Sequence, residues 1–299
     1  MPSLRARAAT LAVRLVAPRP LPADPADILR VTRRSWGLPG PLAALLSHGV
    51  RIEPTTQPVL GEWVTGGQGA SVVLYFHGGG YVACSPRTHR SITAALAMRL
   101  QARVFALDYR LAPEHPFPAA VDDALAAYRW LLGQGIGPRS VALGGDSAGG
   151  GLVVATLLNI RDAELPLPGC GVCFSPWTDM LGSGSSLLRN AATDVLLQPE
   201  DVPRFARLYL AGADPRSPLA SPLYADLRGL PPLLVQVSDA EILLDDAQAI
   251  HHRCLASGTP STLSIYHGLP HVWQLLGSWV PETNRALTEA ADFIRDHLV

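Results

Sequence analysis

Ser147 is the residue whose type and surroundings most directly indicate chemistry. It stands in Gly145-Asp146-Ser147-Ala148-Gly149, which fits the G-x-S-x-G pattern of a serine nucleophile on a sharp turn between a strand and a helix. An apolar run from Val141 precedes the pentapeptide and a helical pattern follows it. Such a turn holds the serine in a strained backbone conformation that exposes its hydroxyl, and side chains at Gly145 or Gly149 would clash with neighbouring backbone. The pattern predicts nucleophilic attack by Ser147 on a carbonyl carbon.

Three backbone amides near this turn are expected to stabilise a developing negative charge. The amide of Ala148 would lie at a helix N-terminus, where N–H groups have no partner within the helix. Gly78 and Gly79 belong to His77-Gly78-Gly79-Gly80, a glycine turn that directly follows a predicted strand. Glycines let the backbone approach a ligand closely and aim N–H groups at an oxyanion. We therefore expect Gly78, Gly79 and Ala148 to form an oxyanion hole, the alternative being a plain flexible turn.

A base and an acid to activate the serine are expected further along the chain. His271 lies in a loop after the last predicted strand, and His267 is its only nearby rival. Four acids crowd the region after the preceding strand, at positions 239, 241, 245 and 246. The order serine, acid, histidine is the one expected when a G-x-S-x-G turn carries the nucleophile. The residue types therefore predict a triad of Ser147, one of these acids, and His271.

The elements that must position these groups alternate along the chain. Short apolar runs predict strands, and the longer runs between them predict helices. Besides the strand before Ser147, we expect strands at 50–54, 58–64, 71–76, 103–108, 170–175, 230–238 and 261–266. Such alternation is typical of βαβ units, in which helices cover both faces of a parallel sheet.

Two regions depart from this alternation and predict a cap over the carboxyl ends of the strands. Helical patterns precede any convincing strand, at 4–16, 25–36 and 42–46. The segment 177–222 is long and punctuated by glycine and proline, and its one helical run covers 199–210. The predicted organisation is N-terminal cap helices at 1–48 and a catalytic domain at 49–299, with a cap insertion at about 178–222.

Composition excludes several classes of protein. With 299 residues, of which 48% are hydrophobic and 16% charged, the chain is expected to fold around a sizeable core. Its net charge of −1 provides no overall basic field to attract nucleic acid or an anionic membrane. Arg14 interrupts the apolar part of residues 1–19, and no run approaches the roughly 18 apolar residues of a membrane span. We expect a cytoplasmic protein that binds neither nucleic acid nor membrane.

The cysteines and basic residues exclude further chemistry. All 24 basic residues are arginine, which excludes a mechanism through a lysine Schiff base. Cys170 and Cys173 have C-x-x-C spacing, but they lie within an apolar run and no second cluster supports a zinc site. With Cys84 and Cys254, they are expected to be free thiols in a reducing compartment. We expect no metal.

Four motifs together resemble the hormone-sensitive-lipase family, the bacterial family IV esterases of the α/β-hydrolase superfamily. They are H-G-G-G-Y at 77–81, D-Y-R-L-A-P-E at 108–114, F-P-A-x-x-D-D at 117–123 and G-D-S-A-G-G at 145–150. The resemblance covers nearly the full chain. It implies an α/β-hydrolase fold with a mostly parallel, eight-stranded sheet flanked by helices, a helical cap, and no cofactor.

The same resemblance selects one acid for the triad. Many members of the family carry the catalytic acid as the first residue of D-P-L-x-D-D. This chain departs from that pattern and reads E-I-L-L-D-D at 241–246, which places Glu241 at the catalytic position. Glutamate can serve because the acid only orients the imidazole and stabilises its cation. Asp239 is the alternative acid, and Asp245 and Asp246 are expected to stabilise the N-terminus of the following helix.

The residues and the resemblance together predict a carboxylesterase. It would hydrolyse short- to medium-chain acyl esters through an acyl-enzyme intermediate, with a small-molecule ester as its substrate. The alternatives are an amide, formamide or specific acetyl hydrolase, and a non-catalytic small-molecule receptor on the same scaffold. The family also implies a homodimer that pairs through the last strand and C-terminal helix, residues 263–299.

Other residues are expected either to contact the substrate or to support the structure around the site. The residues expected to line the acyl pocket are Tyr81, Trp177, Phe205, Tyr209 and Ile242. Asp146 is expected to brace the turn that carries the nucleophile. A buried, hydrogen-bonded brace behind the site is expected from Asp108, Arg110 and Glu114.

Overall fold

Runs of buried apolar side chains form the central strands of this protein. The computed structural model describes residues 1–17, 20–22, 24–36 and 47–299. Every residue is buried in β3 (Val72–Phe76), β5 (Val141–Asp146), β6 (Cys170–Phe174) and β7 (Leu233–Ser238). Burial on both faces is what a parallel sheet covered by two layers of helices requires. The apolar runs in the sequence are continuous because both faces of these strands are covered by helices.

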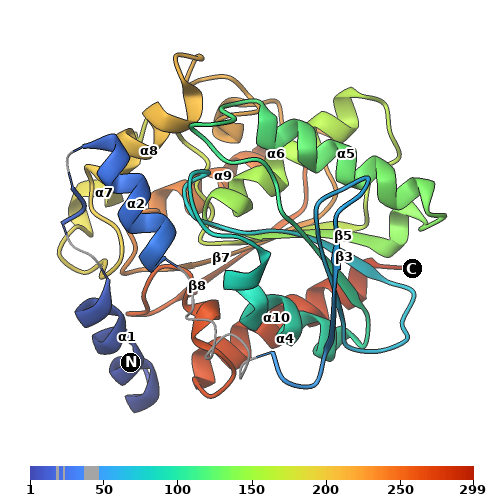
Figure 1. Cartoon of the computed structure of the whole chain (residues 1–299), viewed down its shortest axis with the longest axis horizontal. Helices are drawn as coiled ribbons and strands as arrows, with labels where there is room; N and C mark the ends of the chain where they lie inside the picture. The colour runs from blue at the N-terminus through green and yellow to red at the C-terminus, as the bar shows by residue number, and fades with distance from the viewer. Residues whose placement is uncertain (18–19, 23, 37–46) are drawn as a thin grey trace.

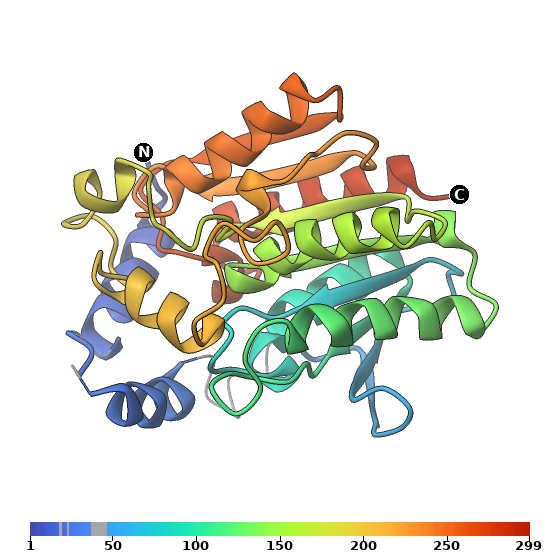
Figure 2. The ribbon, with the colours of Figure 1, turned by 90° about the horizontal axis from the view of Figure 1, so that it is seen from above.

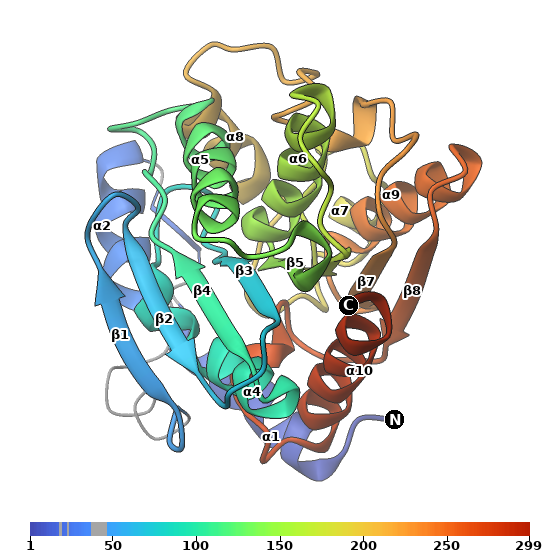
Figure 3. The same cartoon turned by 90° about the vertical axis from the view of Figure 1, so that its right-hand side faces the viewer.

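These strands belong to one eight-stranded sheet with the order β1-β2-β4-β3-β5-β6-β7-β8. Only β1 (Arg51–Thr55) and β2 (Gly61–Thr65) pair antiparallel, β1 with β2 and β2 with β4 (Arg103–Leu107). The opposite edge is β8 (Ser261–Tyr266), whose side chains are partly exposed. Figure 3 shows the sheet with β1 and β8 at its two ends. The predicted mostly parallel, eight-stranded sheet is confirmed.

The first hairpin begins later than the sequence predicts. Strands were expected at 50–54 and 58–64, but β2 starts at Gly61, three residues after the predicted start. Thr55 pairs with Gly61, so the five residues between them form the connecting loop. Pro58 lies in that loop, because proline has no N–H to contribute to a strand ladder.

Helices cover both faces of the sheet. One layer contains α4 (Arg90–Leu100) and α10 (Pro281–His297), which contact each other. The other contains α5 (Ala119–Gly133), α6 (Ala148–Asp162) and α9 (Leu244–Ala256), as Figure 3 shows. Four short 3-10 helices lie in the described loops: η1 (Pro86–His89), η2 (Pro138–Ser140), η3 (Pro222–Tyr224) and η4 (Trp273–Leu276). In the described residues, no helix is both long and apolar enough to cross a membrane.

The remaining helices gather at one end of the molecule (Figures 1 and 2). They are α1 (Leu4–Val16), α2 (Pro25–Ser35), α7 (Ser186–Arg189) and α8 (Asp201–Leu210). The predicted helical segments 4–16, 25–36 and 199–210 therefore form helices, whereas the short α7 was not predicted. The predicted helix at 42–46 lies outside the described residues. Helix α1 is attached to α10, because the N–H and hydroxyl of Ser3 donate to the Glu282 carboxylate at 2.6 and 2.8 Å.

The turn between β5 and α6 requires glycine for steric reasons. A Cβ at Gly149 would lie 2.0 Å from the backbone oxygen of Phe76. A Cβ at Gly145 would lie 2.3 Å from the Gly149 oxygen and 2.9 Å from that of Phe76. The two glycines therefore let the turn pack directly against the end of β3, beside the His77-Gly78-Gly79-Gly80 loop.

We expect Gly149→Ala to destabilise the protein, because the added methyl group meets rigid backbone. Overpacking of this kind costs about 3 kcal/mol of unfolding free energy, which corresponds to a Tm lower by about 5–10 °C. Gly133→Ala is the matched control, since a Cβ there meets nothing within 4 Å. Thermal denaturation should leave the control at or slightly above the wild-type Tm. Equal Tm values for the two variants would contradict the packing argument.

Candidate active site

Ser147 occupies a strained backbone position between β5 and α6. Its φ and ψ are 54° and −121°, outside the regions that residues other than glycine usually adopt. Its N–H donates to the Phe174 oxygen at 2.8 Å, and its carbonyl accepts from the Trp177 and Gly151 amides at 2.9 and 3.1 Å. These backbone bonds hold the conformation in place. The serine thus stands on the predicted sharp turn from strand to helix.

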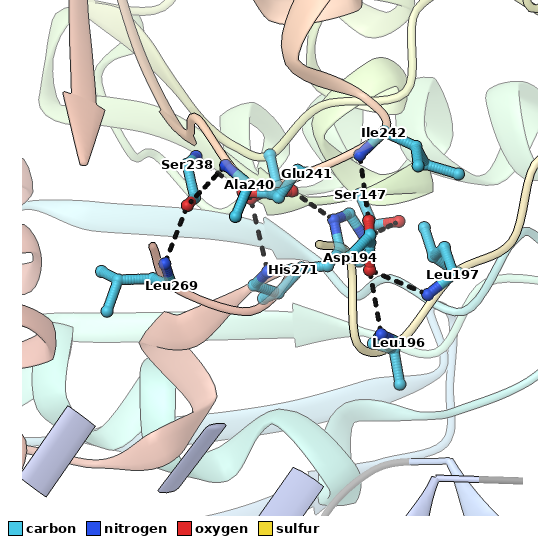
Figure 4. Close-up of polar contacts among 12 residues, drawn as sticks. Ser147, Asp194, Leu196, Leu197, Ser238, Ala240, Glu241, Ile242, Leu269 and His271 are labelled. Carbon is cyan, nitrogen blue, oxygen red and sulfur yellow. Dashed lines mark hydrogen bonds and ion pairs between the residues drawn. The ribbon is translucent and has the colours of Figure 1, made fainter. Parts of the chain in front are cut away.

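His271 lies between Ser147 and Glu241. Its Nε2 is 2.9 Å from the Ser147 hydroxyl, and its Nδ1 is 2.5 Å from Oε2 of Glu241. The three residues come from the ends of different strands, because Glu241 follows β7 and His271 follows β8. Glu241 is fully buried and His271 is 6% exposed. Figure 4 shows the three side chains in the same region. The fold therefore brings the three sequence-predicted residues into one chain of hydrogen bonds.

The second oxygen of Glu241 is fixed by two further donors. Oε1 accepts from the Ser238 N–H at 2.7 Å and from the Ser175 hydroxyl at 2.8 Å. Ser175 also accepts from the N–H of Val272, the neighbour of His271, at 3.3 Å. Sequence reasoning missed Ser175, since a serine after a buried strand is common and its partner lies 66 positions away.

Burial and the carboxylate have opposite effects on the titration of this pair. Burial raises the pKa of Glu241, although the contact with His271 opposes that effect. Burial by itself lowers the pKa of His271, but the nearby Glu241 carboxylate outweighs it and leaves the pKa above its ordinary value. A carboxylate that favours the imidazolium helps the histidine accept a proton.

The alternative residues Asp239 and His267 pair with each other at the surface. Nδ1 of His267 is 2.7 Å from Asp239, and the Gly268 N–H donates to the same carboxylate at 2.8 Å. Both side chains are exposed, and neither is part of the hydrogen-bonded chain that contains Ser147. Asp245 and Asp246 lie in the first turn of α9, as predicted. They also accept hydrogen bonds from the insertion, Asp246 from the N–H groups of Thr178 and Asp179 and Asp245 from Ser185 and Ser186.

The glycine loop after β3 lies directly against the nucleophile. A Cβ at Gly78 would be 3.1 Å from the Cβ of Ser147 and 2.3 Å from a carboxylate oxygen of Asp146. Gly79 and Gly80 have φ values of +112° and +62°, which favour glycine. The ring of His77 turns away and stacks on Tyr109 with centroids 4.3 Å apart. The loop therefore brings the backbone of Gly78 close to Ser147, as the sequence predicts, and Ala148 begins α6 beside it.

Asp146 braces the turn from behind. Its carboxylate accepts from the Tyr75 hydroxyl at 2.7 Å and lies 3.1 Å from Nε2 of His89, and all three side chains are buried. Burial opposes ionisation, but His89 and Tyr75 hold the pKa of Asp146 below its ordinary value. The bracing role agrees with the sequence prediction. His89 was not predicted, because nothing in its local sequence distinguishes it from a surface histidine.

The predicted buried brace of Asp108, Arg110 and Glu114 is wrong. All three residues are exposed. Arg110 pairs with Asp123 at 2.7 Å, and Glu114 pairs with Arg33 of α2 at 2.6 Å. Arg33 also donates to the carbonyl oxygens of Val82 and Ala112 at 2.8 and 3.1 Å. Glu114 and Arg33 therefore join α2 to the loops around the site, and this contact lies at the surface.

A small cavity of about 30 Å³ adjoins Ser147. Among the described residues, its lining consists of Trp36, Gly80, Ser147, Trp177, Leu197, Asp201, Val202, Phe205 and Leu243. Trp177 and Phe205 of the predicted acyl-pocket set are therefore in its wall. Tyr81 and Tyr209 stack on each other with centroids 3.8 Å apart and are buried outside the lining, as is Ile242. Apart from Ser147, Asp201 and Gly80, the lining is aromatic or aliphatic, which suits an apolar group.

The described part of the chain contains no cluster of histidine, cysteine and carboxylate side chains that could hold a metal ion. The four cysteines are free, and three of them are buried. Burial raises the pKa of the Cys173 thiol, which makes it a poor ligand and nucleophile.

Comparison with known proteins shows the fold and the family of the chain. A family model described as alpha/beta hydrolase fold matches residues 73–275. An acetyl-hydrolase from Streptomyces hygroscopicus is 49% identical over 235 residues, which are 78% of this chain and 79% of that protein. An esterase from Acinetobacter venetianus is 36% identical over 223 residues, 74% of each chain.

Solved structures extend the similarity to the whole chain. An esterase from the bacterial hormone-sensitive lipase family superposes with a TM-score of 0.90 at 43% identity, and the match covers 100% of both chains. EstE5, in a crystal soaked with p-nitrophenyl butyrate, superposes with a TM-score of 0.91 at 39% identity over 99% of both chains.

We expect Glu241→Gln to lower the pKa of His271, because the substitution removes the negative charge that raises it and leaves the burial that lowers it. Asp239→Asn is the control, since Asp239 contacts His267 instead. Titration of the imidazole protons by NMR measures both variants. A pKa of His271 that stays at the wild-type value in Glu241→Gln would show that the buried contact does not set its titration.

Proposed function

This chain belongs to the hormone-sensitive-lipase family of α/β-hydrolase-fold esterases, and from that premise we propose that Ser147, Glu241 and His271 are its catalytic triad. The protein is a serine carboxylic ester hydrolase. The observation that carries the proposal is the continuous contact from the Ser147 hydroxyl through His271 to Glu241, at 2.9 and 2.5 Å. A nucleophile, a base and an acid that orients the base are the three groups that acyl transfer needs.

Hydrolysis then proceeds in two similar steps. His271 accepts the hydroxyl proton as Ser147 attacks the ester carbonyl, and Glu241 stabilises the imidazolium. The amides of Gly78, Gly79 and Ala148 donate to the oxyanion of the tetrahedral intermediate. His271 gives its proton to the departing alcohol and leaves an acyl-serine. A water molecule then attacks this acyl-enzyme, with His271 as the base and the same amides holding the oxyanion. This step releases the carboxylic acid and restores the serine.

We propose short- to medium-chain acyl esters as substrates, with the shortest acyl groups preferred. The cavity beside Ser147 has a volume of about 30 Å³, room for roughly two or three water-sized groups. Phe205 and Leu197 are part of its wall, so an acyl chain that outgrows the cavity would have to displace wall residues such as these. The similarity to an acetyl-hydrolase supports the same preference.

The N-terminal helices and the insertion at about 178–222 together form the proposed cap. The rings of Trp36, after α2, and Phe205, in α8, meet with centroids 5.1 Å apart. Both residues line the cavity beside Ser147. Since the wall combines residues from both segments, we propose that the two parts of the cap jointly determine which acyl groups fit.

Substitution of the triad tests the mechanism. We expect Ser147→Ala to lower kcat for p-nitrophenyl butyrate hydrolysis by about 10⁴-fold or more, and Glu241→Ala by about 10³- to 10⁴-fold. Asp239→Ala is the matched control and should stay within a few-fold of wild type, because its carboxylate faces solvent. Loss of activity in Asp239→Ala with normal turnover in Glu241→Ala would reassign the acid. A wild-type protein that hydrolyses p-nitroanilides faster than esters would instead indicate an amidase.

Phe205→Ala tests the limit on acyl-chain length. Removal of the ring enlarges the cavity, so the ratio of kcat/KM for the hexanoate to that for the acetate ester should rise about tenfold or more. Phe293→Ala on α10 is the control, because it removes a phenyl ring that is partly buried against His297 and does not line the cavity. A chain-length profile unchanged by Phe205→Ala would mean that the acyl group binds elsewhere.

A further inference from the structure

The residues that carry Glu241 are fixed by side chains of the insertion. The acid loop, defined here as residues 239–242, lies between β7 and α9. Its first residue still bonds to β8, through the Asp239 N–H and the Tyr266 oxygen at 2.9 Å, and residues 240–242 lie beyond the strand pairing. Each of its four carbonyl oxygens accepts a hydrogen bond from a side chain in the segment 186–193. Ser186 donates to Ile242 at 2.7 Å and Thr193 donates to Ala240 at 3.0 Å.

Asn190 makes the central contacts of this set. Its Nδ2 donates to the carbonyl of Glu241 at 2.7 Å and to that of Asp239 at 2.9 Å. Only the amide nitrogen can donate to two carbonyl groups, so the chemistry fixes the orientation of the side chain. Asn190 is 7% exposed, and water therefore competes little for these bonds.

Asp194 completes the connection and extends it to the substrate cavity. One oxygen accepts from the Ile242 N–H at 3.0 Å, and the other accepts from Leu196 and Leu197 at 2.9 Å each (Figure 4). Leu197 lines the cavity beside Ser147. The same insertion thus contacts both the acyl cavity and the backbone of the acid.

We propose that Asn190 is a positioning residue that sets the backbone of Glu241, so that its carboxylate reaches His271. This inference rests on the triad proposed above. A glutamate has one more rotatable bond than an aspartate, so its carboxylate is placed less strictly by its own backbone. Ser238 and Ser175 fix the carboxylate end, and Asn190 fixes the backbone end. A displacement of about 1 Å in a catalytic group can cost about 100-fold in rate.

The pH dependence of the reaction distinguishes this role from general support of the fold. The charged groups that raise the pKa of His271 are Glu241, Asp194 and Asp146, against the lowering effect of burial. The base must be neutral, so kcat/KM rises with pH through the pKa of His271. When Glu241 moves away, that pKa falls, and the acidic limb of the profile moves to lower pH. Asn190 is uncharged, so its removal takes no charge from the site, and a shift of the limb to lower pH reports the movement of a charged neighbour.

The experiment compares Asn190→Ala with wild type in p-nitrophenyl butyrate hydrolysis. We expect kcat per active site to fall by about tenfold to 100-fold, with KM within about twofold and the acidic limb at lower pH. Titration of Ser147 with a fluorophosphonate counts the active sites, so unfolded protein does not contribute. Asn284→Ala is the matched control: it removes an asparagine that accepts from Arg99 at 2.6 Å, away from the triad, and should behave as wild type.

Two results would overturn the proposal. One is wild-type kcat per active site in Asn190→Ala, and the other is a reduced kcat with an unmoved acidic limb. Should Asn190→Ala not fold, Thr193→Val tests the same idea, because it keeps the side-chain shape and removes only the hydroxyl that donates to Ala240. Thr193→Val should give a smaller shift of the limb in the same direction, since the hydroxyl also donates to the Asn190 carbonyl at 3.0 Å, and no shift would count against the proposal. Activity retained in Glu241→Ala would refute the triad itself, which is a separate outcome.

Discussion

The positive φ of Ser147 constrains the residues around it. A residue with a side chain pays about 1–3 kcal/mol to adopt such a conformation, so the surroundings must maintain it. The backbone bonds to Phe174 and Trp177 do so, and they require β6 and the start of the insertion to lie where they do. The same turn approaches the end of β3 so closely that only glycine fits at positions 145 and 149. The serine, the glycine loop and the start of the insertion are thus parts of one packed arrangement.

Two buried carboxylates lie on different sides of this turn, and each contacts a histidine. Glu241 contacts His271, which also reaches the serine hydroxyl, whereas Asp146 contacts His89 and the Tyr75 hydroxyl. A buried carboxylate is costly unless its oxygens are hydrogen-bonded, and both meet that condition. Only the pair that contains His271 touches the serine. Chemically similar pairs therefore have different roles, decided by which one the strand ends place beside the nucleophile.

Much of the fold and of the site could be predicted because the evidence was local in the sequence. Buried apolar runs predicted the strands, and the glycine pattern predicted the turn at Ser147. Glu241, the proposed acid of the triad, could be selected from the sequence only through its spacing to Asp245 and Asp246. Ser175, His89 and Asn190 were missed, since each acts through a partner more than 40 positions away and has no motif of its own. The exposed positions of Asp108 and Glu114 were also misjudged, because a motif records which residues occur together and says nothing about their depth in the fold.

The hydrogen bonds between the insertion and the acid loop have a consequence for protein engineering. Segments inserted over an active site are often exchanged between related enzymes in order to change substrate preference. Here the side chains of 186–194 are matched to the backbone of 239–242, which lies about 50 positions later. A chimera that takes the two segments from different parents can break these bonds even when both parents are active. The two segments are best exchanged together, as one crossover block.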